Sequence, residues 1–320
     1  MCKGAIEATA MKLALECQKV SHWFGRKRVL HEVELQVPRG QFLSLVGPSG
    51  CGKSTLLRAI LGTHLPNTGS ILVWRAGQSE AHCVQGPGRD RGIVYQHYSL
   101  YPFLTALENV AIGLMLDQTS LPFRFFQWPR WRKLRKQHLA EAAAMLNRVK
   151  LADALDLYPQ EMSGGMRQRV ALAQALVMKP AIILLDEPFG ALDEATREDL
   201  QKLLLELHDE NVAALRDGGT PAHTLIIVTH ELNEALLVGD RVVGLSQYWD
   251  WKSESHATCP GATIIYDKPA PIFKAEQPHE FAQFTRQREE IRRVVFDPAT
   301  ACKRAEHIVP MTPVSAATAT

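Results

Sequence analysis

The chain has 320 residues, 46% of them hydrophobic and 22% charged, with a formal net charge of +2. This composition is ordinary for a globular protein with a large core, and the small net charge argues against a basic surface for nucleic acid. Six cysteines are scattered without a Cys-x-x-Cys pair, which argues against a disulfide framework or a zinc site and favours a reducing compartment.

The order of apolar runs predicts the fold class. The N-terminus shows no apolar core before a cleavage site, and no stretch approaches 18 apolar residues, so neither a signal peptide nor a membrane span is predicted. Short apolar runs predict strands, at residues 13–20, 33–37, 41–46, 70–74, 92–96, 181–186, 224–229 and 241–246. Helical patterns lie between them, at 53–62, 104–115, 134–149, 163–178, 194–210 and 231–238. This alternation predicts an α/β fold with a mainly parallel sheet.

Two regions depart from the alternation. Residues 97–162 hold almost no strand pattern and are predicted to be a helical insertion in the α/β body. After residue 246 the sequence predicts a loop, a strand at 262–266 and an amphipathic helix at 278–296, and residues 310–320 are expected to be disordered. The apolar side of that last helix is formed by Phe281, Phe284, Ile291 and Val295.

The stretch GPSGCGKS follows a predicted strand and precedes a helix, as the pattern G-x-x-x-x-G-K-[ST] requires of a phosphate-binding loop. Its glycines let successive N–H groups point at phosphates, and the helix N-terminus adds partial positive charge. Lys53 would reach the β- and γ-phosphates of ATP, and the Ser54 hydroxyl would ligate Mg²⁺. The predicted nucleotide-binding residues of this loop are Gly47, Pro48, Ser49, Gly50, Cys51, Gly52, Lys53, Ser54 and Thr55.

Cys51 allows two interpretations. A thiol at a helix N-terminus can have a lowered pKa and become reactive. The position can also simply need a small side chain, and this second interpretation is favoured.

The stretch AIILLDEP places two adjacent acids at a strand end, where they are costly unless a cation faces one of them. Neighbouring strand residues point to opposite sides, so the two carboxylates can separate. We expect Asp186 to bind Mg²⁺ and Glu187 to act as general base on the attacking water. His230 follows another strand and is expected to hydrogen-bond the γ-phosphate. It does not belong to a His-Glu-x-x-His zinc motif, because residue 234 is Glu.

A second glycine-rich turn, Ser163-Gly164-Gly165, begins the helix predicted at 163–178. A helix N-terminus of this kind is also an anion-binding site. The chain therefore has two phosphate-binding turns more than a hundred residues apart, although one nucleotide needs only one.

These motifs, in this order, resemble the nucleotide-binding subunit of ATP-binding-cassette (ABC) transporters over residues 13–246. The motifs are the phosphate-binding loop, Gln96 after a strand, SGGMRQR, LLDEP, GALD and the histidine of VTHE. The resemblance implies a P-loop NTPase core with an antiparallel β subdomain. The core would span 11–246, with a helical subdomain inserted at about 97–178, and 247–320 would be a C-terminal extension.

The resemblance also implies why there are two turns. In this family ATP lies between two subunits, so the turn 163–165 of one copy would cap the γ-phosphate held by its partner. Asp193 would lie at the dimer seam, and Gln96 would sense Mg²⁺ and the attacking water. Phe24, with Trp23 as runner-up, would stack on adenine. Met162 replaces the usual Leu, and Gly190 stands where Ser is common.

Two stretches, 117–136 and 211–223, are longer than usual for this family. Within the first, the segment 122–136 holds six basic residues, five aromatics and no acid. It lies in the insertion that faces the membrane subunits in this family. One interpretation is a contact with those subunits or with lipid headgroups. The other, which the sequence favours, is a solvated basic face with packed aromatics.

The resemblance implies an ATPase subunit that powers solute import, most similar to importers of nitrate, sulfonates and taurine. Its partners would be a second ATP-binding subunit, as a homodimer, then membrane permease subunits and a solute-binding protein, with no nucleic acid. It would act at the cytoplasmic face of the cell membrane as a peripheral protein. The alternatives are the ATPase of an exporter and a soluble ABC ATPase that acts on nucleic acid or ribosomes. A P-loop kinase is disfavoured because it has no use for the second turn.

Overall fold

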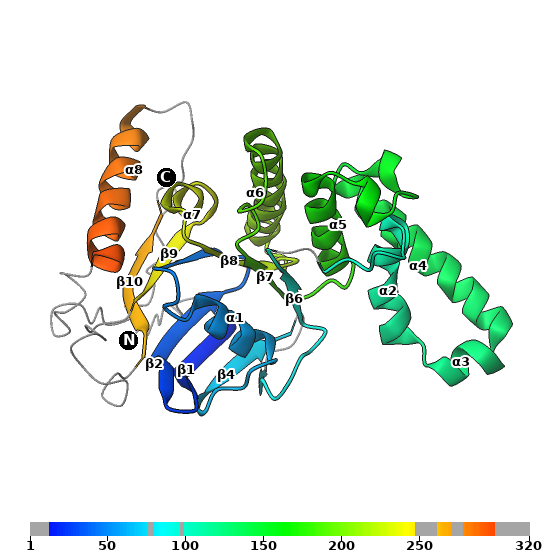
Figure 1. Cartoon of the computed structure of the whole chain (residues 1–320), viewed down its shortest axis with the longest axis horizontal. Helices are drawn as coiled ribbons and strands as arrows, with labels where there is room; N and C mark the ends of the chain where they lie inside the picture. Colours follow the sequence, from blue (N-terminus) through cyan, green and yellow to red (C-terminus); the bar gives the residue numbers. More distant parts are fainter. Residues whose placement is uncertain (1–12, 76–79, 97–98, 247–260, 271–277, 298–320) are drawn as a thin grey trace, which may run out of the picture.

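The computed structural model describes residues 13–75, 80–96, 99–246, 261–270 and 278–297 (Figure 1). It shows a mainly parallel sheet, a smaller antiparallel sheet and a group of helices inserted between strands, which confirms the predicted fold class. The expected boundary at residue 11 and the tail 310–320 lie outside the described residues.

The large sheet has six strands in the order β10-β9-β3-β8-β7-β6. All neighbours are parallel except β10, which runs antiparallel to β9. Its strands are β3 (Phe42–Val46), β6 (Arg91–Val94), β7 (Ile182–Asp186), β8 (Thr224–Thr229), β9 (Arg241–Ser246) and β10 (Thr263–Pro269). The central strands are buried on both faces, so they appear in the sequence as continuous apolar runs, and this is why they were predictable.

The smaller sheet has the order β2-β1-β4-β5 and is antiparallel. Its strands are β1 (Leu13–Phe24), β2 (Lys27–Pro38), β4 (Thr68–Trp74) and β5 (Ala81–Cys83). The first two are longer than predicted, because their outer ends alternate with exposed polar residues and lack a continuous apolar run. The short, largely exposed β5 has almost no apolar signal and was not predicted.

Helices cover both faces of the large sheet. Helix α1 (Lys53–Leu61) lies between the two sheets, where Leu56, Leu57 and Ile60 are fully buried. The opposite face is covered by α6 (Glu194–Arg216) and α5 (Gly164–Leu176), which bury the alternate side chains of the same strands. The strands thus divide their apolar side chains between two cores.

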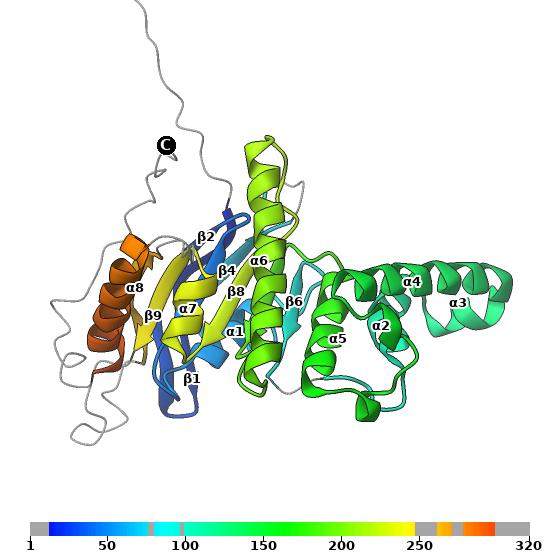
Figure 2. The same cartoon turned by 90° about the horizontal axis from the view of Figure 1, so that it is seen from above.

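The inserted helical subdomain extends away from the sheets (Figures 1 and 2). It comprises α2 (Ala106–Gln118), α3 (Leu121–Phe126), α4 (Trp128–Arg148), α5 and the single 3₁₀ turns η1 (Ala152–Ala154) and η2 (Pro159–Glu161). A capping box between Thr105 and Glu108 begins α2. Helix α3 was not predicted, and α4 begins six residues earlier than predicted, because this stretch is basic and aromatic and lacks an apolar stripe.

Beyond residue 246, β10 adds an edge strand to the large sheet. Helix α8 (Pro278–Ile291) continues into a π-helical turn, η3 (Arg292–Phe296). Ile291 and Val295 are buried and Phe284 packs beside them, as predicted, while the side chain of Phe281 lies outside the described part of the structure. These residues pack with α7 (Leu232–Val238), which follows β8.

Candidate functional site

The predicted residues of the first phosphate-binding loop lie close to Asp186 and Glu187, because all of them lie at the carboxyl ends of neighbouring parallel strands. Strand β3 ends at Val46 before the loop, and β7 ends at Asp186. Strand β8 ends before His230, and β6 ends two residues before Gln96. Because these strands are parallel neighbours, their carboxyl ends share one edge of the sheet, the usual place for a ligand in such folds.

The backbone of the loop 47–54 requires glycine. Gly50 and Gly52 have φ values of 78° and 106°, in the region that favours glycine. A β-carbon on Gly47 would collide with the backbone oxygen of Leu245. The loop therefore turns closely against the end of β9 before α1 begins, with its backbone free of bulky side chains.

Lys53 holds the loop closed. Its Nζ donates to the carbonyl oxygens of Gly47, at 2.7 Å, and Pro48, at 3.0 Å, and the residue is only 6% exposed. This ammonium therefore lies inside the turn of the loop. Ser49, exposed Gly50 and Ser54 border the same turn, and Thr55 belongs to the first turn of α1.

Cys51 is a packing residue in this loop. It is 2% exposed, and burial raises the pKa of its thiol, an effect that the nearby charge of Lys53 only partly offsets. The raised pKa favours the neutral thiol, which is a poor nucleophile. This direction is opposite to the one that a reactive thiol needs, and it favours the small-residue interpretation.

Alkylation at neutral pH should distinguish Cys51 from an accessible cysteine. We expect iodoacetamide to modify exposed Cys83 first and to leave Cys51, as well as Cys17 with its pKa raised to about 12, largely unlabelled in the folded protein. Peptide mass spectrometry measures the labelling, with guanidinium-unfolded protein as the control in which all three react. Rapid labelling of Cys51 in folded protein would contradict the burial argument.

The two adjacent acids do separate. Asp186 faces Ser54, with 3.4 Å between its Oδ1 and the Ser54 Oγ, while Glu187 faces His230, with 3.2 Å between Oε1 and Nδ1. Burial, and then the charge of Glu187, raise the pKa of Asp186. Negative charge is thus held at this edge at an energetic cost, which a cation would relieve.

Glu187 has a strained backbone. Its φ of 49° lies in the left-handed region, which costs a non-glycine residue on the order of 1–3 kcal/mol. The strain is held by two backbone bonds: Glu187 N–H donates to Val228 O at 2.9 Å, and Gly190 N–H donates to Glu187 O at 3.2 Å. This geometry turns the Glu187 carboxylate away from Asp186 toward His230.

Gln96 lies beside the turn that follows Glu187. A β-carbon placed on Gly190 would lie 3.2 Å from the Gln96 Nε2, a tight contact. Glycine at 190, where the resemblance implies serine, thus gives the Gln96 amide room at this edge. Asp193, which the resemblance implies lies at a dimer seam, follows three positions later.

His230 is positioned by its neighbours. The Glu231 N–H donates to Thr229 Oγ1 at 3.0 Å, and that hydroxyl donates to the buried Glu234 at 2.9 Å. A cleft of about 420 Å³ opens beside the histidine and is lined on its other side by the C-terminal extension. Its lining residues from that extension include Arg288, Arg292 and Phe296.

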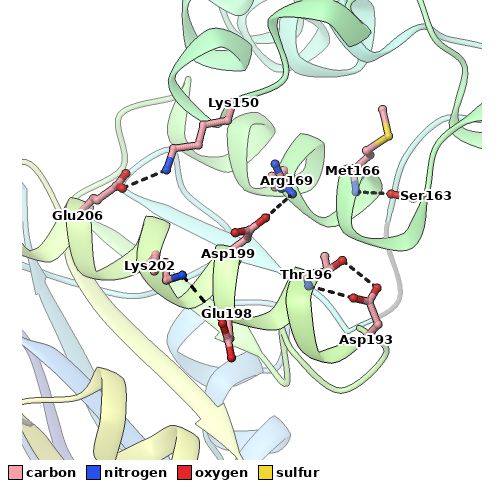
Figure 3. Close-up of polar contacts among 10 residues, drawn as sticks. All are labelled: Lys150, Ser163, Met166, Arg169, Asp193, Thr196, Glu198, Asp199, Lys202 and Glu206. Atoms are coloured by element: carbon pink, nitrogen blue, oxygen red, sulfur yellow. Dashed lines mark hydrogen bonds and ion pairs between the residues drawn. The ribbon is translucent and has the colours of Figure 1, made fainter. Parts of the chain in front are cut away.

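The second turn, 163–165, lies apart from the first, at the start of α5 in the helical subdomain (Figure 1). The Ser163 hydroxyl accepts the Met166 N–H at 3.2 Å and caps the helix (Figure 3). Gly164 follows it, and Gly165 is buried so closely against Thr196 that a β-carbon would collide with the threonine methyl. The two turns do not form one site within this chain.

Thr196 connects this turn to Asp193. The carboxylate of Asp193 caps α6 by accepting the Thr196 N–H at 3.0 Å and its hydroxyl at 2.8 Å (Figure 3). These bonds lower the pKa of Asp193. Sequence reasoning missed Thr196; the only sequence signal was its position three residues after a capping acid.

Phe24 is available for stacking. It is 48% exposed at the end of β1, and its ring packs edge-on against His22, at 4.6 Å between centroids, and His64, at 6.0 Å. Burial lowers the pKa of His22, which favours its neutral form beside the Phe24 ring. Trp23 is less exposed, with its backbone N–H held by Asn67. Sequence reasoning missed both histidines.

The chain resembles known proteins in sequence. A family model described as ABC transporter matches residues 30–190, which is half of the chain. A sulfate/thiosulfate import ATP-binding protein of Cucumis sativus is 42% identical over 233 residues, 72% of this chain and 59% of that protein. The CysA protein of the same description from Escherichia coli K12 is 40% identical over 237 residues, 73% of this chain and 58% of that protein. The chain thus spans about three fifths of the length of these relatives.

The structure agrees with this similarity. It matches a dimeric structure of the ATP-binding cassette MJ0796 bound to ADP and phosphate, with a TM-score of 0.57 and 27% identity, over 81% of this chain and 100% of that one. None of the described helices combines the length and the apolar character that a membrane span requires. Matched motifs, matched fold and the family model agree, and the chain belongs to the ABC transporter family.

Proposed function

We propose that this chain is the ATP-hydrolysing subunit of an ABC importer. The observation that carries the proposal is the shared edge of the parallel strands, where the closed Lys53 loop, the Ser54–Asp186 contact and the Glu187–His230 contact meet. Such an edge offers hydrogen-bond donors for phosphate on one side and a carboxylate that can act as a base on the other. ATP and water would be the substrates, and ADP and phosphate the products.

The chain's own residues divide the work. The N–H groups of 47–54 and Lys53 would hold the phosphates, Thr55 would extend the cradle, and Phe24 would stack on the base. Glu187, turned outward by its strained backbone, would accept a proton from the attacking water. His230 would hold the γ-phosphate and orient Glu187. Gln96 would contact Mg²⁺ and the attacking water.

The same residues fit a magnesium ion. Ser54 Oγ and Asp186 Oδ1 present two hard oxygen atoms 3.4 Å apart, and Mg²⁺ is usually held by one or two such protein groups together with substrate phosphates. Burial and the charge of Glu187 raise the pKa of Asp186, so a cation beside this carboxylate would stabilise its ionised form. Gln96 is the third proposed ligand. The ion would neutralise charge on the phosphates.

Two copies would complete each site. Ser163, Gly164 and Gly165 present a capped helix N-terminus in a different part of the chain from the first loop, so we propose that they bind the γ-phosphate held by a second copy. Asp193 would lie at the seam between copies. The relative of known structure is described as dimeric, which supports this arrangement.

We further propose that the dimer drives separate permease subunits at the cytoplasmic face of the membrane, supplied by a solute-binding protein. The transported solute would be a small oxyanion. Nitrate, sulfonates and taurine are the sequence-based expectation, and sulfate and thiosulfate appear in the names of the relatives. We keep 11–246 as the nucleotide-binding unit and 247–320 as its extension, with β10 completing the sheet.

Purification from native membranes tests this function. A tagged chain should bring membrane-embedded subunits with it, and the isolated complex should hydrolyse ATP faster when a solute-binding protein loaded with its oxyanion is added. Uptake into vesicles distinguishes import from export, because only an importer accumulates solute on the side where ATP is hydrolysed. A chain that binds no membrane subunit but binds nucleic acid in a salt-dependent manner would favour the soluble ABC ATPase instead.

A further inference from the structure

The segment 122–136, here called the basic-aromatic hairpin, comprises α3 from its second residue onward and the first part of α4. It has six basic residues, five aromatics and no acid. Figures 1 and 2 show α3 and the start of α4 at the end of the helical subdomain that lies farthest from the sheets. The second half of α4 contributes to the core through His138, Ala142 and Leu146, whereas residues before it do not.

Three of its aromatic side chains face solvent. Phe125 and Phe126 are each 80% exposed and Trp128 is 55% exposed. The expected packing of the aromatics is therefore wrong for these three, although Phe123 and Trp131 are half-buried. The rings pair as Phe125 with Phe126, at 5.4 Å between centroids, and Trp128 with Trp131, at 5.0 Å, and large exposed apolar surfaces of this kind mark interaction sites.

The hairpin holds these side chains in place. The Ser120 hydroxyl accepts the Phe123 N–H and begins α3. Arg124 ties α3 to the end of α2 by donating to Thr119 Oγ1 and to Met115 O, each at 2.8 Å. The exposed aromatic side chains are thus carried by two helices that hydrogen bonds hold in place, and not by an irregular loop.

The charges of the hairpin divide into two groups. Three of the six are used within the structure: Arg124 in the contacts above, Arg130 by donating to Gln127 Oε1 at 3.0 Å, and Arg135, which lies 3.5 Å from Glu108 and over the ring of Trp131. Arg132, Lys133 and Lys136 are exposed, and within the described residues none has a carboxylate partner. Trp128, Arg132 and Lys136 follow one another at intervals of four residues, so they lie on one face of α4, with the aromatic residue first and the two cations after it.

We propose that the basic-aromatic hairpin binds directly to an anionic lipid surface, with Phe125, Phe126 and Trp128 entering the headgroup region and Arg132, Lys133 and Lys136 contacting lipid phosphates. Exposed aromatics on α3 and at the start of α4, followed along α4 by exposed cations, fit the pattern of interfacial membrane binding. A flat surface of anionic headgroups fits a projecting tip with spread charges and needs no matching pocket. This contact would add to the one that permease subunits provide, and it requires no nucleotide.

Vesicle co-sedimentation with the full chain, without nucleotide, tests the proposal. The chain should bind vesicles of phosphatidylglycerol and phosphatidylcholine, and it should bind pure phosphatidylcholine vesicles much more weakly. The triple variant R132Q/K133Q/K136Q should lower the partition coefficient on the order of 100-fold at low salt, because each basic residue near an anionic surface contributes about fivefold. The variant F125S/F126S/W128S should remove the part of the binding that survives high salt.

The matched control is K150Q/K202Q/R216Q, which removes the same charge from exposed positions on and near α6. Lys150 and Lys202 form only surface ion pairs with glutamates, so this control should fold normally and bind vesicles like the wild type. Circular dichroism and ATP hydrolysis in solution confirm that every variant is folded.

Three outcomes would overturn the proposal. In the first, the wild type fails to bind anionic vesicles. In the second, R132Q/K133Q/K136Q and the control K150Q/K202Q/R216Q lose binding equally, which indicates that only the net charge of the protein matters. In the third, the hairpin variants bind vesicles normally but no longer co-purify with membrane subunits in detergent, which identifies a protein partner. ATP hydrolysis is measured separately, so failure of lipid binding leaves the proposed ATPase function standing.

Discussion

Replacing Glu187 with Gln should leave ATP binding intact and lower the rate of hydrolysis about 10²- to 10⁴-fold, the usual contribution of a general base. Gln has the same shape and tolerates the same left-handed backbone, so the backbone hydrogen bonds of residue 187 to Val228 and Gly190 should persist. The amide can still meet His230 but cannot accept a proton from water. The rate is measured as phosphate release and binding as the affinity for a fluorescent ATP analogue.

Glu231 provides the matched control. Its carboxylate lies 3.7 Å from the other ring nitrogen of His230 and is more exposed than that of Glu187. Glu231→Gln removes the same charge beside the same histidine, yet it should keep near-normal hydrolysis. If both variants lose hydrolysis equally, the loss comes from the negative charge around His230, and Glu187 is not the general base.

The first phosphate-binding loop and the acidic strand end could be predicted because their signals are local. Gly50 and Gly52 adopt backbone conformations that few other residues allow, and an apolar strand precedes each motif. Parallel pairing of β3, β8, β7 and β6 then brings the strand ends together without any further sequence signal.

Other features depend on contacts between distant parts of the chain. Thr196 meets Gly165 across two helices, and His64 joins Phe24 from the far end of α1. The left-handed backbone of Glu187 is fixed by a hydrogen bond to a neighbouring strand, which no local pattern encodes. Helix α3 was missed for a different reason: its aromatic side chains face solvent and give no amphipathic stripe.

Two inactive variants should restore each other's activity if two copies complete each site. Lys53→Met removes the ammonium that the first loop encloses, and Met fills similar space at this buried position. Ser163→Leu removes the hydroxyl of the second turn and places a larger apolar group there. Each variant alone should hydrolyse ATP at close to the background rate. Ser120→Leu, which removes the cap of α3, controls for the stability of about 1 kcal/mol that a lost cap costs.

Restoration follows from two-fold symmetry. In a mixed dimer, one site combines the Lys53→Met loop with the Ser163→Leu turn, while the other combines an unaltered loop with an unaltered turn. Mixed dimers isolated with two different tags should therefore regain up to about half of the wild-type rate, and a random mixture about a quarter. The rate per wild-type chain should also fall on dilution as dimers separate.

The alternative is that each chain forms a complete site. In that case Ser163→Leu would keep its own activity, mixed dimers would give only the average of the two variants, and dilution would leave the rate per chain unchanged. The structure argues against this outcome, because Ser163 and Gly165 belong to the helical subdomain, packed against α6, while Lys53 is enclosed by the loop between the two sheets. In the proposed arrangement, the helix N-terminus that begins at Ser163 binds the triphosphate that a second copy holds.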